Sequence, residues 1–125
     1  MKIKTSELKG KDLDLGVAVC LGHKDIITDF GVYIRIKTQP AGALTFCPST
    51  DWALGGLIIE REKISLEWMS GAGDAGADVW VATRYERPGI AEEQGPTPLV
   101  AAMRCFVASR LGDEVDITNV MKGDK

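Results

Sequence analysis

The sequence predicts an α+β fold, in which a small, mainly antiparallel sheet of about three to five strands is packed by helices. Two kinds of pattern predict it. In some segments apolar residues recur every three or four positions, as in amphipathic helices, and in others apolar and polar residues alternate, as in half-buried strands. With 125 residues, of which 45% are hydrophobic and 26% charged, the chain can close one hydrophobic core. We therefore expect a single domain over residues 1–125, with residues 119–125 frayed.

The first helix is expected over residues 9–21, where Leu13, Val17 and Cys20 recur at helical spacing. Gly22 follows as a C-terminal stop, because glycine adopts the left-handed conformation that ends many helices. The segment therefore predicts one amphipathic helix.

Strands are expected where apolar and polar residues alternate, over residues 32–37, 64–69 and 79–83. The last two are close enough in the sequence to form a hairpin. A short return strand over 43–46 and an edge strand over 115–117 complete the predicted sheet.

Two long connections accompany these strands. Residues 70–78 are rich in Gly, Ala and Asp and predict a mobile hairpin loop, whereas residues 85–95 predict a second irregular stretch. Residues 71–76 spell the GxGxxG of dinucleotide-binding loops. The chain then enters a predicted strand, however, and not the helix that phosphate binding requires. We interpret this segment as a hairpin loop.

A helix start is predicted just before Trp52, since three side chains there can accept hydrogen bonds from first-turn amides: Ser49, Thr50 and Asp51. We interpret Trp52 as a core anchor beside these caps, the alternative being the floor of a binding surface. The adjacent Gly55 and Gly56 cost about 2 kcal/mol in a helix interior. We therefore expect a break, followed by a second helix over 56–62 that buries Leu57.

The best-specified element is a helix over residues 98–111. Thr97 can cap it, Pro98 suits its first position, and Gly112 ends it. Its inward stripe is expected to comprise Leu99, Met103, Phe106, Val107 and Leu111. Removal of Phe106 is expected to unfold the domain.

Composition excludes several function classes. The net charge is -3 and the pI about 5.1, with basic residues scattered singly, so a nucleic-acid partner is not expected. No run approaches the roughly 20 apolar residues that span a bilayer, so no membrane partner is expected. Three cysteines without CxxC spacing are typical of reduced thiols in a cytoplasm.

A metal site could be drawn from Cys20, His23, Asp25 and Asp29. A buried cysteine on a helix stripe and an exposed histidine beyond the helix end explain the same residues without a metal. His23 is also the only imidazole, and no Ser or Cys lies in a nucleophile motif. We therefore assign no catalytic residue, metal or cofactor.

Two charged residues, Glu60 and Arg104, lie inside apolar runs. If both turned inward they would need partners, but we favour the interpretation that both reach solvent. The residues singled out as binding candidates are Ser49, Thr50, Asp51, Trp52, Glu60, Trp80 and Arg104.

A set of short motifs spread over most of the chain resembles the NinX-like family of phage and prophage proteins. The motifs are KTSEL at 4–8, STDW at 49–52, Gly56 with IIE at 58–60, WVA at 80–82, GPTPL at 95–99, AAMR at 101–104 and GDEV at 112–115. The resemblance implies an accessory phage protein from a family without an assigned activity, and related phage domains imply an α-β-α sandwich. It singles out several of the binding candidates but assigns them no role.

The leading hypothesis is a non-enzymatic phage accessory protein in the bacterial cytoplasm that binds a protein partner of host or phage origin. The alternative is a small-ligand-binding or enzymatic domain with a polar site around Asp51, Trp52, Glu60 and Arg104. A homodimer through exposed sheet edges is a further expectation left open.

Overall fold

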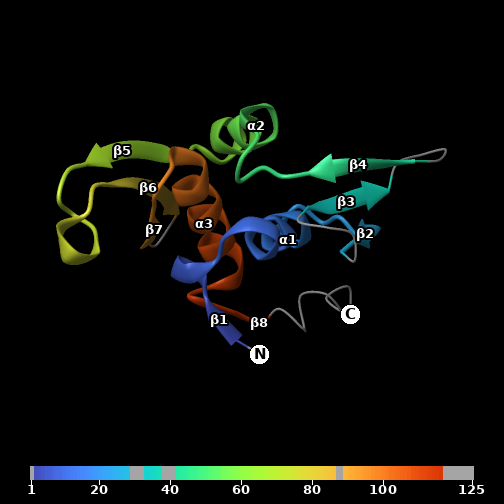
Figure 1. The fold of residues 1–125 in the computed structure, drawn as a ribbon, viewed down its shortest axis with the longest axis horizontal. Coiled ribbons are helices and arrows are strands. Elements are labelled where there is room, and N and C mark those ends of the chain that lie inside the picture. The colour runs from blue at the N-terminus through green and yellow to red at the C-terminus, as the bar shows by residue number, and fades with distance from the viewer. Residues whose placement is uncertain (1, 29–32, 38–41, 87–88, 117–125) are drawn as a thin grey trace.

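The computed structural model describes residues 2–28, 33–37, 42–86 and 89–116 (Figure 1). Its elements follow in the order β1 (Lys2–Lys4), η1 (Thr5–Glu7), α1 (Gly10–Cys20), β2 (Ile26–Ile27), β3 (Ile34–Lys37), β4 (Ala43–Phe46), α2 (Trp52–Glu62), β5 (Ser65–Met69), η2 (Asp74–Gly76), β6 (Val79–Glu86), β7 (Gly89–Gly95), α3 (Pro98–Leu111) and β8 (Glu114–Asp116). The expected fraying of residues 119–125 lies outside the described residues.

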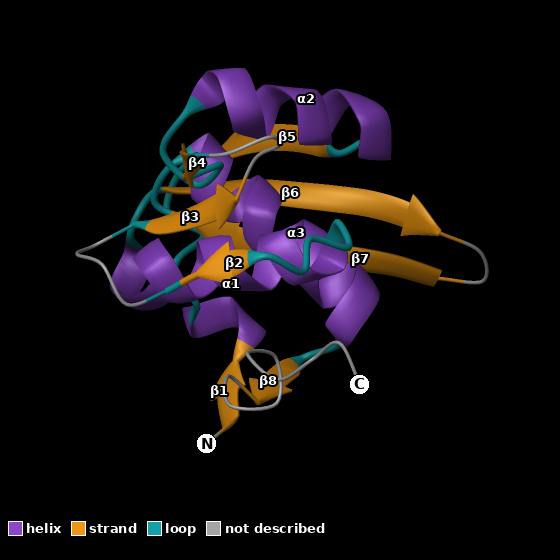
Figure 2. Cartoon of the chain, turned by 90° about the vertical axis from the view of Figure 1, so that its right-hand side faces the viewer, coloured by secondary structure: helices purple, strands orange, loops and turns teal. Residues whose placement is uncertain are grey.

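The α+β class is confirmed, but the described strands divide among three antiparallel sheets, ordered β1-β8, β2-β3-β4 and β5-β6-β7, and not one sheet. The helices α1 and α3 lie between the two three-stranded sheets (Figures 1 and 2), which therefore cannot hydrogen-bond to each other. This layering differs from the helix–sheet–helix order that the family resemblance implies. The strand β1, which the sequence did not indicate, pairs with β8 through Ile3 and Val115.

The hairpin of β5 and β6 is confirmed, with Trp68 opposite Trp80. The expectation of an irregular 85–95 stretch was wrong for its described residues, because residues 85–86 complete β6 and residues 89–95 form β7. The inward face of β7 carries Ala91, Glu93 and Gly95, so its sequence lacks the large apolar residues of the usual strand pattern. At Gly95 an added Cβ would lie 2.6 Å from the Ala101 nitrogen, which shows how closely α3 approaches this strand.

The helix α3 runs through the middle of the core. Thr97 Oγ1 accepts a hydrogen bond from the Val100 N–H, Pro98 occupies the first turn, and the chain leaves the helix at Gly112, whose φ is +88°. These local expectations are confirmed. Leu111, however, is exposed and not part of the buried stripe, because it lies at the end of the helix.

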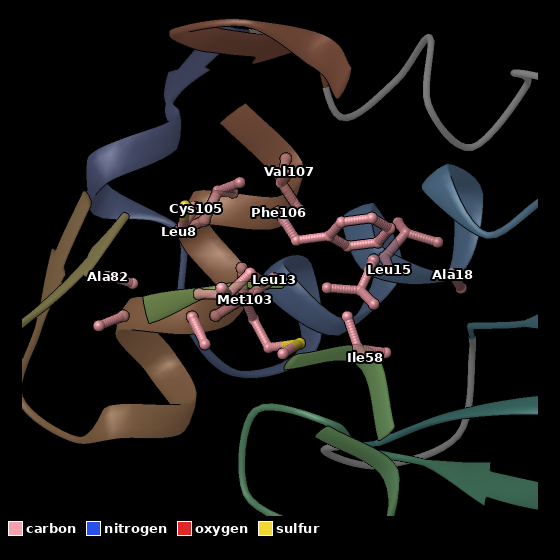
Figure 3. Packing of buried hydrophobic residues seen from close by; sticks show 14 of the residues in the cluster. Leu8, Leu13, Leu15, Ala18, Ile58, Ala82, Met103, Cys105, Phe106 and Val107 are labelled. Atoms are coloured by element: carbon pink, nitrogen blue, oxygen red, sulfur yellow. The ribbon is translucent and has the colours of Figure 1, made fainter. Parts of the chain in front are cut away.

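The core joins α3 to α1 and α2. Phe106 and Met103 are fully buried and pack in one cluster with Leu13 of α1 and Ile58 of α2 (Figure 3). The helix α1 ends as expected, with Gly22 at a φ of +87°.

The expected break in α2 was wrong, since the helix continues through both glycines. A Cβ at Gly55 would lie 2.5 Å from the Pro48 carbonyl oxygen and 2.6 Å from Leu99 Cδ2. Close packing of α2 on the preceding turn and on α3 therefore outweighs the weak helix propensity of glycine.

The two glycines of α2 should respond oppositely to substitution. Gly55→Ala should destabilise the fold by about 1–3 kcal/mol, because the added methyl overpacks the contact with Pro48 and Leu99. At Gly56 the nearest atom, Trp52 Cε3, is 3.8 Å away, so Gly56→Ala should stabilise the helix by about 0.5–1 kcal/mol. Urea unfolding of both variants measures the difference; equal effects would contradict the packing account.

Candidate functional site

An apolar cleft of about 580 Å³ lies along α2 and is the candidate site. Its lining comes from three elements: Leu21 after α1, Phe46 at the end of β4, and Leu54, Leu57, Ile58, Glu60, Arg61 and Lys63 on and after α2. We call it the α2 cleft. Its walls are apolar, and its charged groups come from the C-terminal end of the helix.

The exposed face of α2 adds apolar surface to this cleft. Leu57 is 65% exposed and Trp52 55% exposed, so the expectations that Leu57 is buried and that Trp52 anchors the core were wrong. The reason is that Gly55 and Ile58 form the inward side of the helix, which turns Trp52 and Leu57 toward solvent. A surface leucine and tryptophan on one helix are the kind of residues that protein interfaces bury.

The N-terminus of α2 is fixed by two carboxylates. Asp51 Oδ1 accepts a hydrogen bond from the Ala53 N–H at 2.9 Å and caps the helix as expected. Asp14 of α1 accepts one from the Ser49 N–H, also at 2.9 Å. Asp51 is the N-cap, so Ser49 and Thr50 do not hold that position, and Thr50 Oγ1 donates to the Cys47 carbonyl at 3.4 Å. Burial raises the pKa of Asp14 to about 6, against the opposing effect of the Ser49 hydrogen bond.

The C-terminal end of α2 is held by an ionic cluster that the sequence did not indicate. The carboxylate of Glu62 is 7% exposed and accepts contacts from Arg61 Nε at 3.0 Å, Arg110 Nη2 at 3.0 Å and Arg84 Nη2 at 3.2 Å. Arg84 also pairs with Glu86. Burial by itself raises the pKa of Glu62, but hydrogen bonds from Arg110 and Arg61 leave it below its ordinary value. The cluster ties α2 to β6 and α3.

The predicted polar site around Asp51, Trp52, Glu60 and Arg104 is not assembled in one hollow. Glu60 lines the α2 cleft, whereas Arg104 lines a separate groove beside β7 and the 70–78 loop. Asp51 and Trp52, at the other end of α2 from Glu60, line neither.

The Arg104 side chain is partly buried and donates hydrogen bonds to two backbone carbonyls. Its Nε donates to the Leu8 carbonyl at 2.7 Å and its Nη1 to the Gln94 carbonyl at 2.8 Å, so it joins η1, β7 and α3. Burial lowers its pKa, and the nearby Glu93 partly offsets that effect. Of the two charged residues in apolar runs, only Glu60 is exposed to solvent as we favoured.

Trp80 is half-buried and packs edge-on against Trp68, with ring centroids 5.4 Å apart. Their position in the register explains the contact, because the two residues face each other across β5 and β6. The structure thus gives Trp80 a packing contact in the sheet.

No group of three or more potential metal ligands occurs among the described residues. The three cysteines are free, and burial raises the pKa of both Cys20 and Cys105 to about 12, so these thiols stay protonated at neutral pH. The 71–76 segment leads into β6 as expected, and Asp78 Oδ1 closes the loop by accepting from the Gly71 N–H and the Ser70 hydroxyl. In the described part of the chain, no helix is long and apolar enough to span a membrane.

Comparisons with known proteins agree with the family resemblance. A family model described as "Bacteriophage P22, NinX" matches residues 4–110. Among solved structures, the crystal structure of a phage protein from Bacillus cereus is similar, with a TM-score of 0.55 and 13% identity over 82% of this chain and 90% of that chain. At this identity the likeness shows a shared fold. No curated protein matches the chain.

Proposed function

The chain belongs to the NinX family of bacteriophage P22, and we propose that it is a phage protein that acts by binding another protein through the α2 cleft. The observation that carries this proposal is the apolar cleft itself, which is lined by the exposed Leu57 of α2. Apolar groups at the centre of a surface and charged groups at its rim are typical of protein interfaces.

The rim of the cleft indicates the chemistry of the partner. Glu60 is acidic, while Arg61 and Lys63 are basic, so the rim carries one excess positive charge. The Arg61 Nε lies 3.0 Å from a carboxylate oxygen of Glu62, and 58% of the Arg61 side chain is exposed. A partner segment with a large apolar side chain next to an acidic one fits this arrangement. We propose that the partner comes from the host or the phage.

We propose a binding role without catalysis because no catalytic constellation is assembled at the cleft. His23, the only imidazole, lies outside the cleft lining and packs edge-on against Phe46, with ring centroids 5.5 Å apart. The free cysteines fit the reducing cytoplasm of a bacterial host, where we place this binding.

The proposal is tested by capture of tagged protein from phage-infected cells, followed by reconstitution with the purified partner. Leu57→Ser should weaken binding about 10- to 100-fold, because a buried leucine contributes about 1.5–3 kcal/mol. Leu44→Ser is the matched control, since Leu44 is 66% exposed on β4 and does not line the cleft.

Calorimetric titration of each variant against the purified partner measures the effect. Loss of binding in Leu57→Ser with retention in Leu44→Ser supports the proposal. Absence of a stoichiometric partner, or equal binding by both variants, contradicts it.

A further inference from the structure

The sheet β5-β6-β7 has an outer face that no described helix covers. On the inner face Ala82 packs in the core, and α3 lies along β6 and β7 (Figure 1). Because successive residues of a strand point to opposite faces, the neighbours of Ala82 and Trp80 along β6 point outward. The outward residues are therefore those at odd numbers in β6.

These outward residues form a strip along the central strand that is apolar except at Thr83, which lies between Val81 and Tyr85. Met69 lies opposite Val79 at one end of the strip, Tyr85 lies opposite Ile90 at the other, and Val81 is between them. Val81 is only 7% exposed, yet it is not part of the main core cluster. Tyr85 is 74% exposed and Ile90 57% exposed. The strip is thus a second apolar surface, on a different element from the α2 cleft; we call it the outer sheet face.

Charge on the outer sheet face has one sign. Glu67 lies directly opposite Val81 on β5, and Glu92 lies opposite Thr83 on β7. Both carboxylates are exposed, and no Lys or Arg points outward from the described residues of these three strands. The apolar strip is therefore bordered by acidic groups.

This charge selects among possible occupants. Two copies of the chain meeting through this face would bring their Glu67 and Glu92 carboxylates around one apolar centre, where like charges repel. A nucleic acid would be repelled for the same reason. A helix suits an open sheet face, as α3 shows on the opposite side. The complementary occupant is a helix with an apolar stripe flanked by Lys or Arg.

We propose that the outer sheet face binds a basic amphipathic helix of another protein, independently of the α2 cleft. The apolar stripe of that helix covers Val81, Tyr85 and Ile90, and its Lys or Arg side chains meet Glu67 and Glu92. The two surfaces have opposite rim charges, so the chain can hold two different partners at once.

The test uses the whole chain and a synthetic amphipathic Leu/Lys peptide of the length of α3, with a Leu/Glu peptide as the matched probe. Binding is measured by fluorescence anisotropy, and the site is mapped by amide chemical shifts. We expect the Leu/Lys peptide to bind, to shift β6 and its neighbours, and to weaken with added salt. The Leu/Glu peptide should not bind.

Charge-reversal variants distinguish binding at the outer sheet face from a general attraction of the basic peptide to an acidic protein. Glu67→Lys with Glu92→Lys should weaken the Leu/Lys peptide about tenfold. Glu60→Lys with Glu114→Lys changes the net charge equally but lies on α2 and β8, so binding should stay within about twofold. Ile90→Ser should weaken binding and Leu57→Ser should not, which distinguishes this surface from the α2 cleft.

Equal weakening by both charge reversals would overturn the proposal, because it would show non-specific attraction. Chemical shifts confined to the α2 cleft, equal binding of both peptides, or a dimer that buries β6 in sedimentation and amide-exchange measurements would also overturn it.

Discussion

Phe106→Ala is expected to lower the free energy of unfolding by about 3–5 kcal/mol, because truncating a buried aromatic removes its burial and leaves a cavity. Phe106 is fully buried, packs among the residues of α1 and α2 shown in Figure 3, and carries the Arg110 guanidinium 5.1 Å from its ring centroid. A domain of this size has a total stability of about 5–15 kcal/mol. The loss therefore removes a large share of it and unfolds the chain if its stability is at the low end.

Thermal unfolding followed by circular dichroism measures this effect, with an expected fall in Tm of about 10–25 °C. Tyr85→Ala is the matched aromatic control, because Tyr85 is largely exposed, and it should change the stability by less than about 1 kcal/mol. A Tm for Phe106→Ala close to that of the control would show that the core is not organised around this residue.

The stability of the chain is expected to rise when the pH is lowered from neutral to mildly acidic values. The pKa of Asp14 is about 6 in the fold against 3.8 as its ordinary value, so the folded chain binds this proton more tightly than the unfolded chain. Its contribution is therefore fully present below pH 3.8 and is lost as the pH rises through 6. The whole shift corresponds to about 3 kcal/mol, of which about 1 kcal/mol falls between pH 7 and pH 5.

Glu62 acts in the opposite direction at lower pH. Burial opposes its ionisation, but its arginine partners leave its pKa below the ordinary 4.5. Its stabilising contribution is therefore present above pH 4.5 and is lost as the pH falls through the lowered value. The contribution of Asp14 therefore declines as the pH rises through 6, and that of Glu62 declines at acidic pH.

Urea unfolding at several pH values tests this profile with a matched pair of variants. Asp14→Asn keeps an oxygen that accepts from the Ser49 N–H but cannot ionise, so the gain between pH 7 and pH 5 should become clearly smaller. Asp12→Asn, on the exposed side of the same helix, should leave the gain intact. If the stability of Asp14→Asn still rises as much between pH 7 and pH 5, the rise comes from other groups.

Expectations that depend on a few neighbouring residues agreed with the structure. The cap at Thr97, the stop at Gly112 and the helix between them follow from side-chain and backbone conformations within one turn. The β5–β6 hairpin follows from alternation along each strand. These elements are specified locally, so the sequence was sufficient for them.

Expectations about which face of an element is covered were less accurate. The sequence did not indicate that Gly55 packs on Leu99, which is far from it in the sequence, and so misjudged the continuity of α2 and the burial of Trp52 and Leu57. The strand β7 was missed because Ala91 and Gly95 present too little apolar surface to reveal its inward side.

For the candidate site, the sequence and the structure both single out the segment that contains α2, but they group its residues differently. The residues 49–60 do include the start of α2 and Glu60 at the cleft, whereas Arg104 belongs to a different groove. The Glu62 cluster could not be predicted, since Arg84 and Arg110 come from β6 and α3 and approach Glu62 only through folding.

By itself, then, the sequence determined the α+β class, the family, the capped helix α3 and the hairpin, because periodicity and capping act over a few residues. Only the tertiary structure decided that the strands form separate sheets around the helices and that α2 presents Leu57 beside an apolar cleft. The physical reason is that burial depends on contacts between distant segments, such as the hydrogen bond from the Ser49 N–H to Asp14, which local pattern does not encode.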